Sequence, residues 1–185
     1  MAKATLGWIT IAFIIGIGVG FYFTPEYAQM AAGEKSAMVS LGVADSQFDL
    51  RYVNNMISHH LAAIDMAKQA LLSANRPEIK ALAEVIITSD EAGITKLYES
   101  KKNWYQDEKA VTKFDKVELG GNDALFELRF LNALTSHHEM AIESAKEVRS
   151  KSKRTEVLNL ADEVITSLSA NLIQFETWRK AWYAN

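Results

Sequence analysis

The sequence predicts an all-α protein: a four-helix bundle made of two tandem helical hairpins, preceded by one N-terminal transmembrane helix. Three observations lead to this prediction. Apolar residues recur at helical spacing, the body of the chain contains an internal repeat, and residues 6–23 carry no charge. The 185 residues include only two prolines and nine glycines, so little interrupts long helices.

The composition limits the chemistry that the chain can perform. Hydrophobic residues make up 49% and charged residues 23%, which is enough apolar surface for one sizeable core. The net charge is −3 and the basic residues form no cluster, so we expect no nucleic-acid partner. Because the chain has no cysteine, disulfides, thiolate metal sites and cysteine nucleophiles are excluded.

The first expected element is the uncharged segment 6–23. Its 18 residues would extend roughly 27 Å as a helix, close to the hydrocarbon thickness of a bilayer. Trp8 and Tyr22 stand near its ends, where aromatic rings prefer the membrane interface. A cleaved signal peptide and an uncleaved anchor both fit, and the length of the apolar run favours the anchor. With Lys3 before the segment, we expect a single-pass membrane protein whose C-terminal domain is periplasmic or extracellular.

The body of the chain is a tandem repeat with an offset of 78 residues. Phe48–Lys68 and Phe126–Lys146 share 11 of 21 residues, and the same offset continues to the C-terminus without a gap. We place the repeats at about 45–106 and 123–184. The expected organisation is a membrane anchor over 1–24, a linker over 25–44 and the duplicated bundle over 45–185.

Each repeat predicts two helices. Asp45 or Ser46 is the expected N-cap of the first helix, and Pro77 fits the first position of the second. The third helix should run from Asp123 to about residue 151, and Thr155 should cap the fourth, which ends near residue 183. Between the two hairpins lies the polar connection 107–122. It is long enough to run the length of the bundle, as in ferritin-like proteins, although an up-down-up-down bundle is also compatible with it.

Two adjacent histidine pairs, His59–His60 and His137–His138, are the only histidines in the chain. Both pairs fall near the middle of their helices, so the repeat should bring them to a similar level. The periodicity places His60 and His138 on the core stripe, and His59 and His137 at its margin. Neutral imidazole is a common metal ligand, so a transition-metal site is one interpretation.

Met56 and Met66 lie on one helical stripe with His59. Thioether sulfur combined with imidazole favours copper, particularly Cu(I). The alternative is that the histidines are structural and that the methionines only fill the core. No catalytic constellation is recognised, because the Glu-x-x-His motifs of di-iron sites and the His-Glu-x-x-His motif of zinc enzymes are both absent.

Residues 56–67 read Met-Ile-Ser-His-His-Leu-Ala-Ala-Ile-Asp-Met-Ala. This segment resembles the family called domain of unknown function 305, whose hallmark is Met-x-x-His-His-x-x-Ala-Ile-x-Met-Ala, often duplicated. The resemblance covers about residues 45–185. It implies a ferritin-like bundle outside the cytoplasm and, as in some members, copper binding through histidine and methionine. The positions that match the ligands implied by the family are His59, His60, Met56 and Met66 in the first copy, with His137 and His138 in the second.

The chain also departs from the family pattern. Leu134 and Ser144 replace the two methionines in the second copy. The Gln-x-x-Glu-Ile-x-x-Met pattern that is frequent on the second helix is not kept at residues 90–97, where the methionine is missing. A methionine-rich copper store is therefore not expected, and one site of histidines fits better.

Two functions follow from these patterns. The first is a membrane-anchored, extracytoplasmic protein that binds copper through its paired histidines and acts as a carrier, buffer or sensor. The second is an accessory subunit of a larger membrane protein complex, or of a homo-oligomer, in which the histidines are structural. Gly16 and Gly20 in the expected anchor have the spacing of residues that pack against another membrane helix.

Overall fold

The computed structural model describes residues 40–183, and these residues form four long helices with no β-strand among them. The helices are α2 (Phe48–Ser73), α3 (Pro77–Tyr105), α4 (Phe126–Lys151) and α5 (Thr155–Tyr183). The all-helical class and the four-helix bundle are confirmed. The expected transmembrane segment 6–23 lies outside the described residues. None of the helices between residues 40 and 183 combines the length and apolarity that a bilayer span requires.

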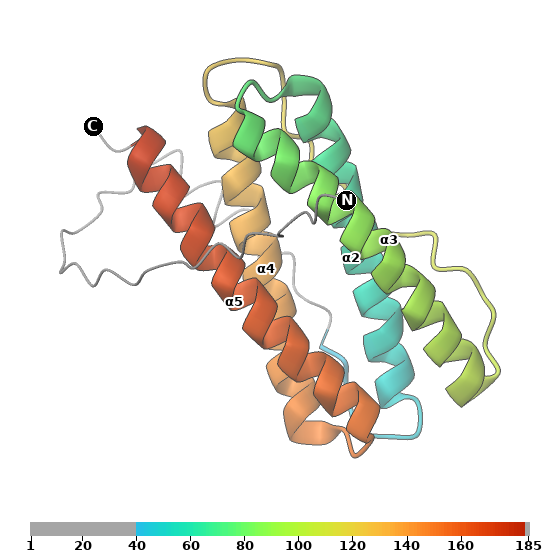
Figure 1. Ribbon diagram of the computed structural model, residues 1–185. Helices are drawn as coiled ribbons and strands as arrows, with labels where there is room; N and C mark the ends of the chain where they lie inside the picture. The colour runs from blue at the N-terminus through green and yellow to red at the C-terminus, as the bar shows by residue number, and fades with distance from the viewer. Residues whose placement is uncertain (1–39, 184–185) are drawn as a thin grey trace, which may run out of the picture. The chain divides into compact units, whose positions relative to one another are not determined.

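The helices pair as two hairpins, α2 with α3 and α4 with α5, and the hairpins meet where α2 packs against α4 (Figure 1). Ala74 and Ser152 end the first helix of each hairpin in extended conformations, with ψ of 146° and 149°. Pro77 occupies the first turn of α3 as expected, since its missing N–H would have no helical partner there. Each hairpin is thus closed by a tight turn that follows from local sequence.

The connection between the hairpins runs along α2 toward the end where α4 begins (Figure 1). Ser58 donates from its hydroxyl to the Lys113 carbonyl at 3.0 Å. One helical turn from the end of α2, the Gln69 amide donates to the Val117 carbonyl at 2.8 Å and accepts from the Leu119 N–H at 3.0 Å. Of the two expected connections, the chain therefore has the one that crosses the length of the bundle.

The bundle core consists of two hydrophobic clusters. The first lies at the α2–α3 turn and includes Met66, Ala74 and Ile79. The second lies at the α4–α5 turn and includes Met56 and Val148. Along α2 the second cluster ends at Ile57 and the first begins at Ala63; along α4 the first ends at Leu134 and the second resumes at Ala141. The four histidines occupy the gap between the clusters on both helices, and we call them the histidine layer.

The start of each repeat is held by an arginine from the first helix. Arg51 and Arg129 each donate to two backbone carbonyls and one aspartate, and the two sets of partners are Leu41, Val43 and Asp45, and Leu119, Gly121 and Asp123. All these partners are related by the offset of 78 residues. The structural repeat therefore begins near residues 41 and 119.

This arrangement corrects the expected helix caps. The N-cap of α2 is Gln47, which makes no side-chain capping bond, and not Asp45 or Ser46. The Asp45 carboxylate lies before the helix and accepts from the Gln47 N–H and from Arg51. Asp123 acts in the same way at the start of α4, where it accepts from the Leu125 N–H. Thr155 is the first residue of α5 rather than the residue before it.

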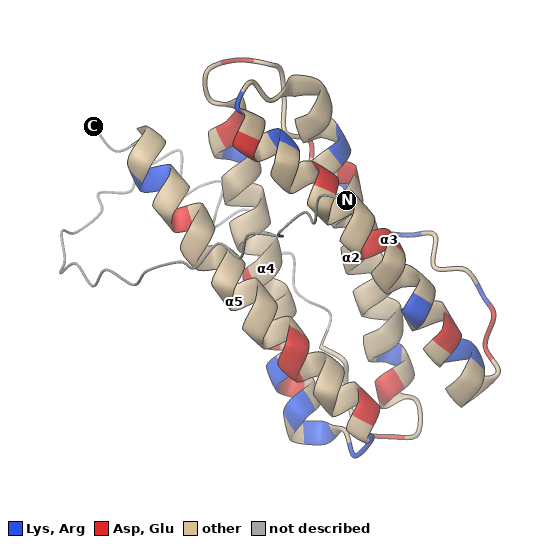
Figure 2. Ribbon diagram, in the orientation of Figure 1, with Lys and Arg blue, Asp and Glu red and all other residues tan. Residues whose placement is uncertain are grey.

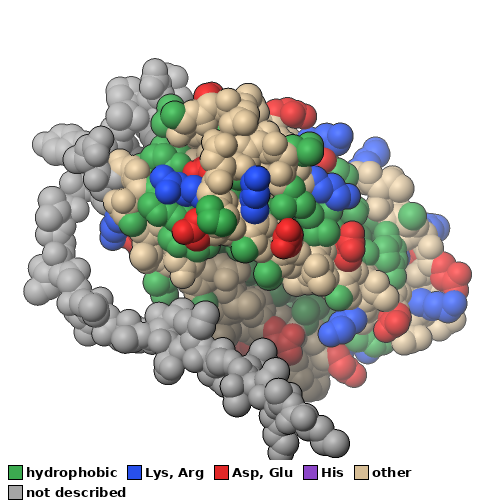
Figure 3. All heavy atoms as spheres, turned by 45° about the horizontal axis from the view of Figure 1, so that its top comes forward, with side chains coloured by type: hydrophobic (Ala, Val, Ile, Leu, Met, Phe, Trp, Pro, Cys, Tyr) green, Lys and Arg blue, Asp and Glu red, His purple; other side chains and the backbone are tan. Residues whose placement is uncertain are grey.

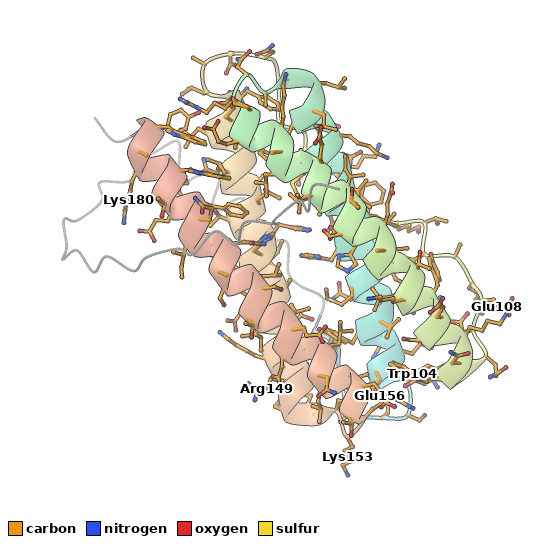
Figure 4. All side chains as sticks on the ribbon, in the orientation of Figure 1. Trp104, Glu108, Arg149, Lys153, Glu156 and Lys180 are labelled. Atoms are coloured by element: carbon orange, nitrogen blue, oxygen red, sulfur yellow. The ribbon has the colours of Figure 1, made fainter. Side chains whose placement is uncertain are left out.

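An arginine from each hairpin turn stacks on a tryptophan of the other hairpin. The Arg76 guanidinium lies 4.4 Å from the Trp182 ring, and that of Arg154 lies 4.7 Å from the Trp104 ring. Figure 4 shows Trp104 at the end of the bundle where α5 begins, near Glu156. These contacts join the two hairpins at both ends of the bundle.

Charged residues occur along the whole length of α3, whereas the central part of α5 carries none (Figure 2). On the face seen in Figure 3, acidic and basic side chains are interspersed among apolar ones. Exposed apolar residues include Val85 on α3 and Ile173 on α5.

Candidate metal centre

The two histidine pairs meet at the contact between α2 and α4. The rings of His59 and His137 are stacked, with centroids 3.6 Å apart and planes inclined by 11°. His59 and His137 were expected at the margin of the core. This expectation is wrong for His137, which is 7% exposed, whereas His59 is partly buried, as His60 is, and faces His137 where the two hairpins join. His60 and His138 are turned instead toward the second helix of their own hairpins. The chain thus brings its four imidazoles into one layer.

One hydrogen bond fixes the proton on His59. The His59 Nε2 atom lies 3.3 Å from the His137 carbonyl oxygen, which can only accept. Nε2 therefore carries the hydrogen, and the Nδ1 lone pair of His59 has no partner in the protein. The ring is neutral in this arrangement and keeps one nitrogen available for a ligand.

His60 and His138 have different neighbours although they are repeat equivalents. The His60 Nδ1 atom lies 3.5 Å from the Asp90 carboxylate on α3. His60 also packs against Gly93, where an added Cβ would lie 3.0 Å from Nε2. By contrast, the Nε2 atom of His138 lies 3.3 Å from the Asn171 amide nitrogen on α5, and its ring lies 5.1 Å from that of Phe175.

Burial keeps His59, His137 and His138 neutral. His137 and His138 are 7% and 5% exposed. Burial lowers the pKa of His137 to about 3, with a further contribution from His138, and lowers the pKa of His138 to about 4, although Asp90 opposes the second shift. Burial and the neighbouring histidines also hold the pKa of His59 well below its usual range. Neutral imidazoles have a free lone pair, so they suit a metal ion.

Several nitrogen atoms of the layer make no hydrogen bond, namely His59 Nδ1, His60 Nδ1, His137 Nε2 and His138 Nδ1. Buried polar atoms are normally paired, so such a group calls for an explanation, and a bound ion is one. Within residues 40–183, no three His, Asp or Glu side chains converge on a point that could hold a metal ion. The chemistry of the donors therefore fits a metal, while the stacked rings would have to turn to share one.

The two methionines predicted as ligands lie on opposite sides of the histidine layer. Met56 is 1% exposed and belongs to the cluster at the α4–α5 turn. Met66 is fully buried and belongs to the cluster at the α2–α3 turn. The structure thus places both thioethers in apolar surroundings and does not bring them together.

Three neighbours of the layer, Asp90, Gly93 and Asn171, were not predicted from the sequence. The repeat relates Gly93 to Asn171, but nothing in a single sequence shows that this position faces a histidine of the preceding helix. The one available signal was a glycine in the middle of a predicted helix, which is unfavourable unless close packing requires it.

Comparison with known proteins places the chain in a family. The model of the family described as domain of unknown function (DUF305) matches residues 25–101, 49–125 and 127–185. The chain belongs to the DUF305 family. This DUF305 protein is also similar to solved structures of CopM. No curated protein sequence matches it.

The CopM structures differ in their bound metal. The Cu(I)-bound form is 31% identical to this DUF305 chain, with a TM-score of 0.66, and the alignment covers 74% of this chain and 98% of CopM. The Cu(II)-bound form is 28% identical with a TM-score of 0.65 over 73% and 97% of the two chains. The silver-bound form obtained by soaking is 30% identical, with a TM-score of 0.66 over 74% and 98%.

Proposed function

We propose that this protein binds copper through the histidine layer and acts as a carrier, buffer or sensor rather than as an enzyme. The observation that carries the proposal is the stack of His59 on His137, which gathers four imidazoles between two apolar clusters. The similarity to CopM, which was solved with Cu(I), Cu(II) and silver, supports copper as the ion.

The ligands would come from His59, His60, His137 and His138. Metal–nitrogen bonds are about 2 Å long, so an ion shared by both pairs requires the stacked rings to swing apart. That movement would exchange the His59–His137 stacking contact for bonds to copper. Met56 and Met66 would contribute only if α2 turned them out of their clusters, so we expect imidazole to dominate the site.

The chain would hold this domain outside the cytoplasm. The uncharged segment 6–23 and the preceding Lys3 support a membrane anchor with the bundle on the periplasmic or extracellular side. A copper carrier in that position would exchange ions with other proteins at the membrane surface. An accessory role in a larger membrane complex or a homo-oligomer remains the second proposal for the same anchor.

The test is copper titration of the full-length chain in detergent. Cu(I) binding is measured without oxygen by competition with a chromophoric chelator, and Cu(II) binding by calorimetry. We expect a fixed stoichiometry that is lost when all four histidines are replaced by alanine. A Met56→Leu/Met66→Leu variant serves as the matched control and should keep most of the affinity.

Circular dichroism shows whether the four-alanine variant still folds. If it does not, single His59→Gln and His137→Gln variants replace it, because glutamine keeps a polar side chain of similar length. Unchanged copper binding by folded histidine variants would refute the proposal. Retention of copper by the histidine variants with loss in the methionine variant would assign the ion to the thioethers instead.

A further inference from the structure

His60 and His138 differ in whether their Nε2 atom is free to bind a metal. The Asn171 amide nitrogen can only donate, so the Nε2 atom of His138 accepts from it and its lone pair is occupied. At the equivalent position, Gly93 has no side chain and places no donor against His60. The lone pair of His60 is thus free of the hydrogen bond that occupies that of His138.

A carboxylate, that of Asp90, lies next to His60 instead of an amide donor. Asp90 lies one helical turn before Gly93 on α3, and its carboxylate is 3.5 Å from the Nδ1 atom of His60, an electrostatic contact that is not aligned as a hydrogen bond. The side chains of His60 and Asp90 are 19% and 18% exposed, so both are partly shielded from solvent. The repeat equivalent of Asp90 is Leu168, which has no polar atom in its side chain. α5 therefore contributes no carboxylate to the histidine layer at this position.

A carboxylate in this position has a known chemical effect on a metal-binding histidine. When it accepts the hydrogen of one ring nitrogen, it fixes the tautomer and the ring orientation, and it makes the other nitrogen a stronger donor to the metal. Gly93 allows the His60 ring to lie against the backbone of α3, because a Cβ there would come within 3.0 Å of the ring. The space beside Gly93 and the carboxylate of Asp90 therefore both affect the position of the His60 ring.

We propose that Asp90 is a positioning residue for copper binding. Its negative charge, 3.5 Å from Nδ1, favours the hydrogen on that nitrogen and leaves Nε2 as the nitrogen that binds the ion, with Gly93 providing the clearance. The site is then asymmetric: His60 in the first hairpin binds copper more strongly than His138 in the second. This inference rests on the proposed function, since it assigns roles within the same histidine layer.

The test uses the full-length chain in detergent and Cu(I) or Cu(II) as the probe. Asp90→Asn removes the negative charge with little change of shape, and we expect copper affinity to fall by about 10- to 100-fold. Glu91→Gln, which neutralises the adjacent exposed acid on α3, is the matched control and should bind as the wild type does. Asp90→Glu keeps the carboxylate and should restore part of the affinity.

A second measurement does not involve the metal. Long-range ¹H–¹⁵N spectra of the metal-free protein report which nitrogen of each histidine carries the hydrogen. We expect the Nδ1–H form for His60 in the wild type and a shift toward the Nε2–H form in Asp90→Asn. A purely structural role for Asp90 would leave this tautomer unchanged. If Asp90→Asn does not fold, Asp90→Ser serves in its place, because it also removes the carboxylate and leaves Gly93 unchanged.

The outcomes separate the two proposals. If the wild type binds copper and Asp90→Asn matches it in both affinity and tautomer, the role of Asp90 is refuted and the proposed function stands. If His138→Ala weakens copper binding more than His60→Ala does, the asymmetry is refuted. If the wild type binds no copper, the proposed function and the inference fail together, whatever the tautomer of His60.

Discussion

The two hairpins have the same framework but differ at the histidine layer. Arg51 and Arg129 hold equivalent segments, and the two turns are alike. At the layer, however, α3 presents an acid and a glycine to its histidine, whereas α5 presents a leucine and an asparagine at the same positions. The framework residues meet the same partner in both copies, while the residues that face the histidines have diverged. The two repeats thus share their packing but differ in the side chains that face their histidines.

The junctions between the hairpins show a second difference. The Glu127 carboxylate is 7% exposed and accepts from the N–H groups of Asn75 and Arg76 at 2.8 and 2.6 Å. Its equivalent, Asp49, forms an ion pair with Arg154 at the longer distance of 3.6 Å. The longer side chain of glutamate thus caps the start of α3, which makes one junction more dependent on its acid than the other.

The largest effect that we expect is on the pH dependence of stability. In the unfolded chain His137 and His138 take up a proton near pH 6.5, whereas in the folded protein they stay neutral until about pH 3 and 4. Stability is therefore full above pH 6.5 and is lost as the pH falls toward 4, by roughly 2 kcal/mol for each histidine at pH 5. Urea unfolding at several pH values measures this loss.

Carboxylates also titrate below pH 5, so the comparison needs a control. A His137→Gln/His138→Gln variant should lose less stability between pH 7 and 5 than the wild type, because neither side chain takes up a proton. Parallel curves for the two proteins would show that the buried histidines of α4 do not cause the loss.

The next effect is at the junctions. Glu127→Ala should lower the free energy of unfolding by about 3 kcal/mol, because it leaves two backbone N–H groups and the Arg76 guanidinium without their partner. Asp49→Ala should lower it by about 1 kcal/mol, since the ion pair with Arg154 is longer. Chemical denaturation of the two alanine variants and the wild type measures these losses. Glu127→Gln keeps an acceptor oxygen, so its loss of free energy of unfolding should lie between those of Glu127→Ala and Asp49→Ala. Equal losses for the two alanine variants would show that the two junctions depend equally on their acids.

A smaller effect should follow from filling the space beside His60. Gly93→Leu should cost about 2 kcal/mol, because its Cβ alone would come within 3.0 Å of the ring. Asn171→Leu replaces a side chain of similar size and should cost about 1 kcal/mol, through the lost hydrogen bond to His138. Thermal unfolding of the two variants measures both losses of stability. A greater loss for Asn171→Leu would mean that α5 packs more tightly on its histidine than α3 does.

The smallest effect concerns a surface contact that only the second hairpin has. Arg149 and Asp162 form an ion pair at 2.8 Å, but both side chains are more than half exposed. Arg149→Ala should therefore change the free energy of unfolding by less than about 0.5 kcal/mol. The equivalent first-hairpin positions hold Leu71 and Glu84, which cannot form an ion pair. A loss above 1 kcal/mol for Arg149→Ala would show that the pair holds α4 to α5.

Much of this fold could be predicted because its signals are local. Helical spacing, the turn before Pro77 and the offset of 78 residues each depend on neighbouring residues or on comparing the chain with itself. The caps were misplaced at Asp45 because Arg51, one and a half turns later, competes for the same carboxylate. The burial of His137 was misjudged because a hydrophobic stripe indicates the buried side of a helix but not which neighbour covers each part of it.

The sequence by itself determined that this chain forms four helices in two similar hairpins and carries its histidines at equivalent places. Only the tertiary structure decided that His59 stacks on His137, and that His60 meets Asp90 and Gly93 where His138 meets Asn171. The physical reason is that helix formation depends on spacing along one chain, whereas these contacts depend on how α2 and α4 rotate and pack against each other and against their partners. That packing minimises the free energy of the whole bundle, and no single segment encodes it.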